Sequence, residues 1–192
     1  MNAPIIIFVV ILLLAGIGTG LYFYFKEGSD ITGDTSGTGG GTKGRYVKLS
    51  QPTANCMNIG DIQVLSAGTN IAKGKLVTQS SRYAEADFPV TNLVDEVFTN
   101  FAHTSCKESG WLSIDLGSDV SIDSIKVINR KDCCSGRIIG AKLEVTDSAN
   151  KVIYTSEAFK GKTGQTAPVE GMDGFAVYTV TLPSTVVTGS DT

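Results

Sequence analysis

The sequence has no excess of basic residues and little charge of either sign. Among 192 residues, 16 are lysine or arginine and 19 are aspartate or glutamate, which gives a net charge of −3 and a charged fraction of 18%. A domain that binds nucleic acid through its phosphates usually carries a basic patch or stripe. The composition therefore argues against a nucleic-acid partner.

Histidines are also scarce, and no two cysteines have the spacing of a zinc site. His103 is the single histidine, and the four cysteines show no C-x-x-C spacing. Structural zinc sites need several Cys and His ligands at short spacings. Nucleophilic catalysis needs a nucleophile, a base and a group that orients the base. The sequence therefore predicts neither a zinc site nor an enzyme.

Charged residues are absent from positions 4–25, which read PIIIFVVILLLAGIGTGLYFYF. As a helix at about 1.5 Å per residue, this run would span roughly 33 Å, the thickness of the hydrocarbon core of a bilayer. A cleaved signal peptide is the alternative, but the run is longer than a typical signal-peptide core and no basic segment precedes it. We expect residues 1–27 to form a transmembrane anchor that contacts the lipid bilayer through residues 4–25.

The segment after the expected anchor, residues 28–44, is rich in Gly, Ser and Thr and is typical of a flexible linker. All four cysteines follow it. An even number of cysteines in a non-cytosolic domain favours disulfides. Residues 45–192 are therefore expected to be one domain outside the cytosol, or in a particle that matures in an oxidised state.

Short β-rich segments dominate the sequence from residue 45 onward. They alternate partly between apolar and polar residues and are separated by turn clusters such as SAGTN, LGSD and TDSAN. Because no convincing amphipathic helix interrupts them, the pattern predicts an all-β, antiparallel sandwich or jelly roll of about eight strands. The segments are RYVKLS, DIQVLSA, KLVTQSS, WLSIDLG, SIDSIKVINR, AKLEVTD, KVIYTS and AVYTVTLP.

A set of polar residues with the chemistry of a sugar site spans two distant segments. His103 lies in a long unpatterned stretch, and the segment RKDCCSGR supplies Arg130, Asp132 and Arg137. One imidazole and two guanidiniums offer directed hydrogen bonds to neighbouring hydroxyls. Asp132 would orient an arginine through a charge-assisted pair. Taken singly, each of these residues could equally be structural or part of an ordinary surface ion pair.

The adjacent cysteines Cys133 and Cys134 allow two interpretations. If they are joined to each other, they form a small strained ring whose flat, polarizable sulfur surface could pack on the C–H face of a pyranose. A nucleophilic cysteine is the competing interpretation, because nearby arginines would lower the pKa of a thiol. That interpretation requires a base, for which His103 is the candidate.

This set of residues resembles the motif of the F-type, fucose-binding lectins, His-x26-Arg-x-Asp-x4-Arg/Lys, and 26 residues lie between His103 and Arg130. The segments NIAKGKLVTQSS, NLVDE, FAHTS, GWLSIDLG and IIGAKLEV are also similar to that family and to the wider discoidin-like (coagulation factor type C) group. The resemblance covers about residues 45–183. It implies a galactose-binding-like jelly roll in which His103, Arg130 and Arg137 bind fucose hydroxyls and the cysteine pair packs on the ring.

The resemblance also implies a structural Ca²⁺ ion beneath the binding loops, held by carbonyl and side-chain oxygens. The segment NLVDE matches the family's Asn-x-x-Asp-Gly-Asn, with Glu96 and Val97 in place of Gly and Asn. The family's last ligands come from a Cys-Glu pair near the domain's C-terminus, and here the matching segment is MNIGDIQV near its N-terminus, as in a circular permutation. The implied ligands are Asn92, Asp95, Val97, Asn100, Gly60 and Asp61, although solvated turn carboxylates remain the alternative for Asp95 and Asp61.

We also expect roles for the remaining two cysteines and for several aromatic residues. Cys56 and Cys106 each lie a few residues from the implied calcium ligands, so a bridge between them would pin the loops. The family places an apolar wall against the fucose methyl group, to which Tyr83, Phe98 and Phe101 are possible contributors. Trp111 is expected in the core.

Two functions are compatible with this sequence. The first is a membrane-anchored, non-catalytic lectin-like protein that binds a fucosylated or related glycan, with its C-terminal domain extracytosolic. The alternative is a structural virion component of a large DNA virus, such as a minor capsid or capsid–membrane linking protein. In that case the lectin-like fold would contact capsid or other envelope proteins.

Overall fold

The computed structural model describes residues 41–84, 87–160 and 176–184. The predicted anchor and most of the predicted linker lie outside these residues, and no helix within them is long and apolar enough to cross a membrane. The first strand, β1 (Thr42–Ser50), begins inside the predicted linker, three residues before the expected domain start. Thr42 explains the earlier start, because its side chain is buried and its Oγ1 donates a hydrogen bond to the Pro183 carbonyl.

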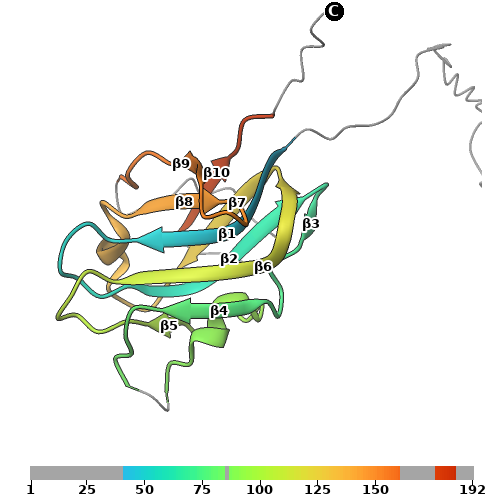
Figure 1. The fold of residues 1–192 in the computed structure, drawn as a ribbon. Coiled ribbons are helices and arrows are strands. Elements are labelled where there is room, and N and C mark those ends of the chain that lie inside the picture. The colour runs from blue at the N-terminus through green and yellow to red at the C-terminus, as the bar shows by residue number, and fades with distance from the viewer. Residues whose placement is uncertain (1–40, 85–86, 161–175, 185–192) are drawn as a thin grey trace, which may run out of the picture. The chain divides into compact units, whose positions relative to one another are not determined.

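The domain is an all-β sandwich of two antiparallel sheets, consistent with the predicted jelly roll (Figure 1). One five-stranded sheet has the order β4-β6-β1-β8-β9, and in the other the order is β10-β7-β2-β3, with β5 paired to β2. The remaining strands are β2 (Asn58–Ser66), β3 (Thr69–Asn70), β4 (Leu76–Gln79), β5 (Ala102–His103), β6 (Trp111–Ile122), β7 (Ser124–Asn129), β8 (Lys142–Thr146), β9 (Val152–Thr155) and β10 (Val177–Thr181). Two short 3-10 helices, η1 (Val90–Val94) and η2 (Ser135–Ile138), lie in the connections.

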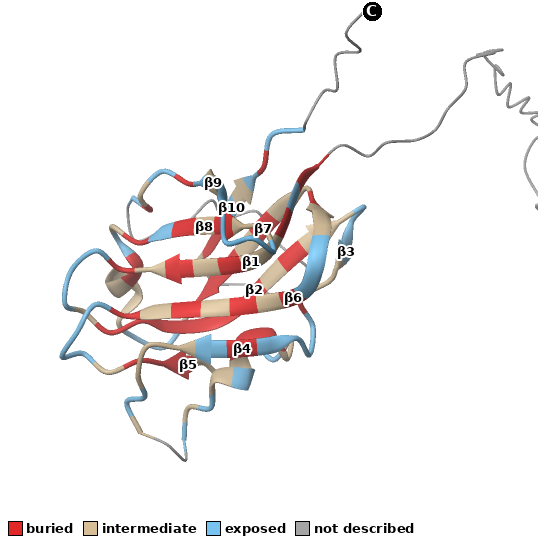
Figure 2. Cartoon of the chain, viewed as in Figure 1, coloured by how far each residue is buried: buried red, intermediate tan, exposed pale blue. Residues whose placement is uncertain are grey.

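The core forms between the two sheets because alternate residues of each central strand face inward. In β1, Val47 and Leu49 are fully buried, and in β6 the inward residues include Leu112 and Ile114. The resulting stripes of buried and partly exposed residues are visible along β1 and β6 in Figure 2. Each fully buried aliphatic side chain contributes about 1.5–3 kcal/mol to folding. Apolar alternation in the sequence thus corresponds directly to this core.

β1 is a central strand although it opens the domain. It pairs with β6 on one side and with β8 on the other, so that Ser50 lies opposite both Trp111 and Lys142. The first and last of the predicted β segments, RYVKLS and AVYTVTLP, contribute β1 and β10, which belong to different sheets.

The pairing of the strands brings three segments together at the candidate site, namely the connection after β1, the segment that contains β5, and the connection after β7. In one sheet β1 ends where β6 and β8 begin. In the other, β2 begins beside β5 and the end of β7, because Asn58 pairs with His103 and Ile59 pairs with Asn129. A hydrogen bond from Gln51 Nε2 to the Arg137 carbonyl links the connection after β1 to η2. These registers bring His103 to the segment that carries Arg130 and Arg137.

Candidate functional site

His103 and Arg137 meet across a long stretch of sequence. The ring atom Nε2 of His103 lies 3.4 Å from Nη1 of Arg137, and Nδ1 lies 2.7 Å from the carbonyl oxygen of Thr104. Because a carbonyl oxygen only accepts hydrogen bonds, Nδ1 carries the ring proton and Nε2 presents a lone pair. The pair therefore offers an acceptor and a set of donors side by side.

The environment of His103 favours its neutral form. Burial lowers the pKa of the ring below its ordinary value of 6.5, and the positive charges of Arg137 and Arg130 lower it further, while the bond to the Thr104 carbonyl acts in the opposite direction. The residue is 4% exposed. At neutral pH the ring is therefore a hydrogen-bond acceptor at Nε2 and not a cation.

Arg130 is held by a carboxylate and an aromatic ring. Its Nη2 donates to Asp132 Oδ2 at 2.6 Å, and its Nε pairs with the second carboxylate oxygen. This hydrogen bonding to Arg130 lowers the pKa of Asp132 to about 2. On its other side, the guanidinium lies 3.9 Å from the centroid of the Phe101 ring. The orienting pair predicted for Asp132 is thus present, and it fixes the plane of the guanidinium.

All four cysteines are joined in the two expected disulfides. Cys133 is bonded to Cys134, and Cys56 is bonded to Cys106. No free thiol remains, so the nucleophilic-cysteine interpretation loses its nucleophile. Cys134 has a left-handed backbone with φ of 62° and directly precedes η2, which carries Arg137. The small disulfide ring and Arg137 therefore belong to one short rigid segment.

An aromatic cluster surrounds His103, and only part of it was expected. The Tyr83 ring lies 4.5 Å from the imidazole, and Phe88 stacks on Phe101 with centroids 4.7 Å apart. Phe98, the third candidate for the apolar wall, instead packs against Ile128 and Val177. Phe88 was missed because no spacing in its loop distinguishes it from the neighbouring residues. Its contact with Phe101 arises only from the folded loop.

The core position expected for Trp111 is wrong. Trp111 is only half-buried and opens β6, where it alternates with the buried Leu112 and therefore faces away from the core. The ammonium of Lys48 lies 5.2 Å from the centroid of its ring. A single aromatic residue at a strand end does not reveal its face, because the face depends on the register of the following strand.

Several implied calcium ligands gather around Asp61. Asn100 Nδ2 donates to Asp95 Oδ2 at 2.7 Å, and the Glu96 amide donates to Asp61 Oδ2 at 3.0 Å. A Cβ atom placed on Gly60 would lie 3.6 Å from the Asn100 carbonyl oxygen, which brings that residue into the same cluster.

Two buried oxygens in this cluster have no hydrogen-bond partner among the described residues, namely Asp61 Oδ1 and Asn100 Oδ1. Burial raises the pKa of Asp61 to about 7, and the nearby charges of Asp95 and Glu96 act in the same direction. Buried oxygens without donors are the chemistry that a hard cation satisfies. No group of three or more His, Cys, Asp or Glu side chains in the described part of the chain is arranged to hold a metal, so such a site would also need carbonyl and amide oxygens.

The other implied ligands are less directly connected to this cluster. Asn92 lies in η1, and its Nδ2 donates to the Phe101 carbonyl at 3.1 Å. Val97 is 46% exposed, and its amide donates to Asp95 Oδ1 at 2.8 Å. Glu96 adopts φ of 62°, the left-handed conformation that favours glycine, which is the residue of the family pattern at this position. The carboxylate of Glu96 accepts a hydrogen bond from Asn70 and pairs with Lys73.

Asn58 is a further polar residue beside the site that sequence reasoning missed. It lies directly opposite His103 in the β2–β5 pair, and directly opposite residues of an antiparallel pair project to the same face. On the other side, Ile59 pairs with Asn129, which precedes Arg130. Both side-chain polar atoms of Asn58 are buried without a hydrogen-bond partner among the described residues. Asn58 therefore occupies the strand position between the two segments that supply the motif.

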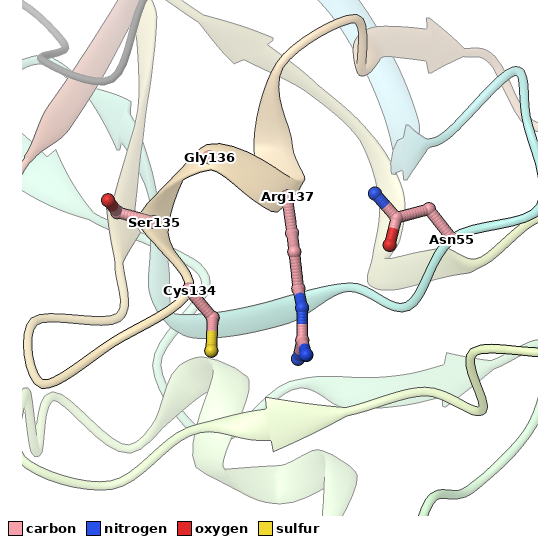
Figure 3. A pocket seen from close by; sticks show the side chains of 5 residues that line it. All are labelled: Asn55, Cys134, Ser135, Gly136 and Arg137. Atoms are coloured by element: carbon pink, nitrogen blue, oxygen red, sulfur yellow. The ribbon is translucent and has the colours of Figure 1, made fainter.

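An open cavity of about 440 Å³ adjoins these residues. Cys134 and Arg137 line it together with Ser135, Gly136 and Asn55, and Figure 3 shows the Arg137 side chain between those of Cys134 and Asn55. Asn55 belongs to the connection between β1 and β2, which sequence reasoning did not assign to the site.

Comparison with known proteins gives a consistent result. Residues 92–178 match the family of NedA-like, galactose-binding domains. Fucolectin from Anguilla anguilla is 33% identical over 85 residues, which cover 40% of this chain and 54% of fucolectin. The pentraxin fusion protein from Xenopus laevis is 25% identical over 114 residues, which cover 55% of this chain and 27% of that protein.

The chain thus spans about half of fucolectin and about a quarter of the pentraxin fusion protein. No solved structure gives a significant match. The family match, the similarity to fucolectin and the two-sheet β-sandwich agree with one another. The domain described here is therefore similar to the galactose-binding-like domains over residues 92–178, and to fucolectin over part of its length.

Proposed function

We propose that the protein is a non-catalytic lectin that binds a terminal fucose or a closely related sugar at His103, Arg130 and Arg137. The galactose-binding-like domain and the similarity to fucolectin support a carbohydrate-binding role. The observation that carries the proposal is the contact between His103 Nε2 and Arg137 Nη1, which places an acceptor beside a donor group in one site. Neighbouring sugar hydroxyls both donate and accept hydrogen bonds, so they are complementary to an acceptor that lies beside a donor.

Each residue has a separate task in this proposal. On sugar binding, the single lone pair of His103 Nε2 exchanges its 3.4 Å contact with Arg137 Nη1 for a hydrogen bond from one hydroxyl, while Arg137 donates to the oxygen of the neighbouring hydroxyl. Arg130, oriented by Asp132, donates to a second position on the ring. The Cys133–Cys134 disulfide offers an apolar sulfur surface to the C–H face of the sugar. Tyr83 and Phe101 lie beside His103, where they would contact the methyl group of fucose.

Calcium would order the loops of the site. The unpartnered buried oxygens of Asp61 and Asn100 support this part of the proposal, because a cation would satisfy both. Asp95, the Gly60 carbonyl and the other implied oxygens would complete the coordination. The ion would have a structural role, since the cluster and the sugar-binding residues consist of different side chains.

The two disulfides support an extracytosolic location for the domain, because such bonds are rare in a reducing cytosol. Attachment to a membrane through residues 4–25 stays a prediction from the sequence. The alternative role as a structural virion component also stays a prediction, which the abundance of this protein in purified particles would test.

A binding measurement tests the lectin proposal. The full-length chain in detergent, supplied with calcium, is titrated with methyl α-fucoside and with methyl α-glucoside as the control sugar. We expect saturable fucoside binding that the substitutions His103→Ala and Arg130→Ala each abolish. Lys151→Ala, an exposed residue of the turn before β9, is the matched control and should bind as the wild type does. Absence of fucoside binding, or binding that is indifferent to both site substitutions, contradicts the proposal.

A further inference from the structure

We propose that the Cys133–Cys134 disulfide is a reversible modification site, at which reduction by a dithiol weakens sugar binding while the Cys56–Cys106 disulfide and the fold stay intact. This inference rests on the proposed binding of fucose at the neighbouring residues. It deepens that function, because it gives the same site a means of regulation.

A reductant can reach one cysteine of each disulfide. In the first bond Cys133 is exposed, and Cys134 is half-buried and lines an open cavity of about 440 Å³. In the second bond Cys106 is exposed, but Cys56 is fully buried. Access to the attacked cysteine therefore does not distinguish the two bonds, and the comparison depends on the sulfur that leaves.

The leaving sulfur has a different environment in each bond. Attack on Cys106 expels Cys56 as a thiolate into a fully buried position, where a charge is costly. Attack on Cys133 expels Cys134 into the open cavity, which Arg137 also lines. Figure 3 shows the Cys134 sulfur and the Arg137 guanidinium extending to the same side of their segment. Because positive charge and access to water both stabilise a thiolate, Cys134 is the better leaving group.

The fold protects one disulfide from reduction far more than the other. A disulfide stabilises a folded protein mainly by closing a loop, and the stabilisation grows with the length of that loop. Cys56 and Cys106 have a sequence separation of 50, whereas Cys133 and Cys134 are neighbours. A bond that stabilises the folded state is stabilised against reduction by folding to the same extent. The bond between neighbours therefore receives little protection of this kind.

The backbone of the neighbouring pair also favours reduction. Cys134 has φ of 62°, in the left-handed region that residues with a Cβ atom rarely adopt. Joined neighbours close an eight-membered ring that contains the peptide bond between them, so the oxidised pair has few conformations available. Breaking the S–S bond lets the chain before η2 leave the left-handed conformation. Strained or exposed disulfides are the labile ones that serve regulation, and this bond has both properties.

Reduction should change the sugar site without unfolding the domain. Gln51 Nε2 donates a hydrogen bond to the Arg137 carbonyl. Asn129 Nδ2 donates to the Ser135 carbonyl at 2.8 Å. Because these bonds involve no sulfur, η2 and Arg137 should keep their place. The two separated thiols no longer form a joined sulfur surface, so the sugar loses the packing proposed for its C–H face.

The proposed step is a balanced thiol–disulfide exchange. One thiolate of the dithiol attacks Cys133, the S–S bond breaks, and Cys134 leaves as a thiolate that takes up a proton. The second thiolate of the dithiol then attacks the mixed disulfide, which releases Cys133 and closes a disulfide within the reductant. The cysteine pair gains two electrons and two protons, and the dithiol loses the same number.

Graded reduction with dithiothreitol tests this proposal on the full-length chain in detergent with calcium. One part of each sample is alkylated, and peptide mapping by mass spectrometry identifies which of the four cysteines were reduced. The other part is titrated with methyl α-fucoside without alkylation. At low dithiothreitol we expect Cys133 and Cys134 alone to be alkylated and Tm to change little. Fucoside affinity should fall about tenfold, comparable with the loss of one packed apolar contact, and reoxidation in air should restore it.

The double variant Cys133→Ser with Cys134→Ser is the control, because it cannot be reduced at this position. It should bind methyl α-fucoside about as weakly as the reduced wild type does. The same concentration of dithiothreitol should not weaken its binding further. The reduced wild type provides the same comparison without any substitution, so the test does not depend on the folding of the variant.

Three results overturn the proposal. Alkylation of Cys56 and Cys106 before or together with the neighbouring pair shows that reduction is not selective. Unchanged fucoside affinity after selective reduction shows that the bond does not control the site. A loss of affinity in dithiothreitol that the double variant shares shows that the effect arises elsewhere. If the oxidised wild type does not bind methyl α-fucoside, the proposed function fails and the regulatory role fails with it, whereas the alkylation pattern still decides whether the bond is selectively reducible.

Discussion

Asp61 makes the stability of the calcium-free protein depend on pH in an unusual direction. Its carboxyl group is buried, one oxygen accepts only the Glu96 amide, and the other has no hydrogen-bond partner among the described residues. Burial raises the pKa of Asp61 to about 7 from an ordinary value of 3.8. The folded protein therefore binds a proton over a pH range in which the unfolded chain has released it.

The sign and size of the effect follow from this difference. Below pH 3.8 the group is protonated in both states and adds nothing to the pH dependence. As the pH rises from about 4 through 7, the unfolded state becomes more stable relative to the folded state, so the free energy of unfolding falls. The difference between the two pKa values corresponds to at most about 4 kcal/mol, reached above pH 7. Bound calcium would remove this penalty, because the ion favours the charged carboxylate.

The substitution Asp61→Asn should have opposite effects on stability in the calcium-free and the calcium-bound protein. Asparagine is neutral at every pH and keeps a similar shape. In chelator at pH 8 the free energy of unfolding of the variant should therefore exceed that of the wild type by up to about 4 kcal/mol. In calcium the order should reverse or shrink, because the variant lacks the charged ligand. Denaturant unfolding at pH 5, 6, 7 and 8, with chelator or with calcium, measures both effects.

Two outcomes refute this reasoning. A difference between wild type and Asp61→Asn that stays constant from pH 5 to pH 8 in chelator shows that Asp61 does not titrate in this range. Calcium that stabilises the variant as much as the wild type shows that Asp61 is not a ligand. Glu157→Gln removes an exposed carboxylate and serves as the control, with little change expected under any of these conditions.

Three further predictions concern the sugar site and the disulfides. Because burial and the two arginines hold the pKa of His103 below 6.5, fucoside affinity should be constant from pH 8 to 6.5 and fall only at lower pH, which titrations across that range measure; a loss centred above pH 7 contradicts a neutral acceptor. Asp132→Asn frees Arg130, so fucoside affinity should fall about tenfold with little change in Tm, because the Asp132 carboxylate is largely exposed; unchanged affinity refutes the orienting role. Replacing Cys56 and Cys106 together by serine should lower the free energy of unfolding by about 4 kcal/mol, since the bond closes a loop with a sequence separation of 50; denaturant unfolding measures this loss, and a loss below about 1 kcal/mol contradicts the bond's stabilising role.

The parts of the site that are local in sequence could be predicted from the sequence. Arg130 and Asp132 are two residues apart, so their side chains could reach one another under almost any loop conformation, and they pair in the structure. Neighbouring Cys133 and Cys134 are likewise joined. The strands could be predicted for a similar reason, because alternation such as that of β1 reports directly on which residues face the core.

Tertiary structure decided the contacts that depend on strand register and loop packing. Asn58 lies beside the site because β2 pairs with β5 at one register, and a shift of one residue would turn its side chain into the core. Trp111 faces away from the core for the same reason. Phe101, and not Phe98, lies under Arg130 because the loop folds in one particular way. Asn55 and Arg137 line one cavity because the connection after β1 folds beside η2.

The sequence by itself thus determined the motif, its local pairs and the alternation that builds two sheets. These features depend on chemistry within a few residues or on a period of two along a strand. Only the tertiary structure decided which side chains outside the motif lie beside it, as Phe88 and Asn58 do. The physical reason is that register and loop conformation are fixed by the packing of the whole domain, and no short segment of the sequence contains that information.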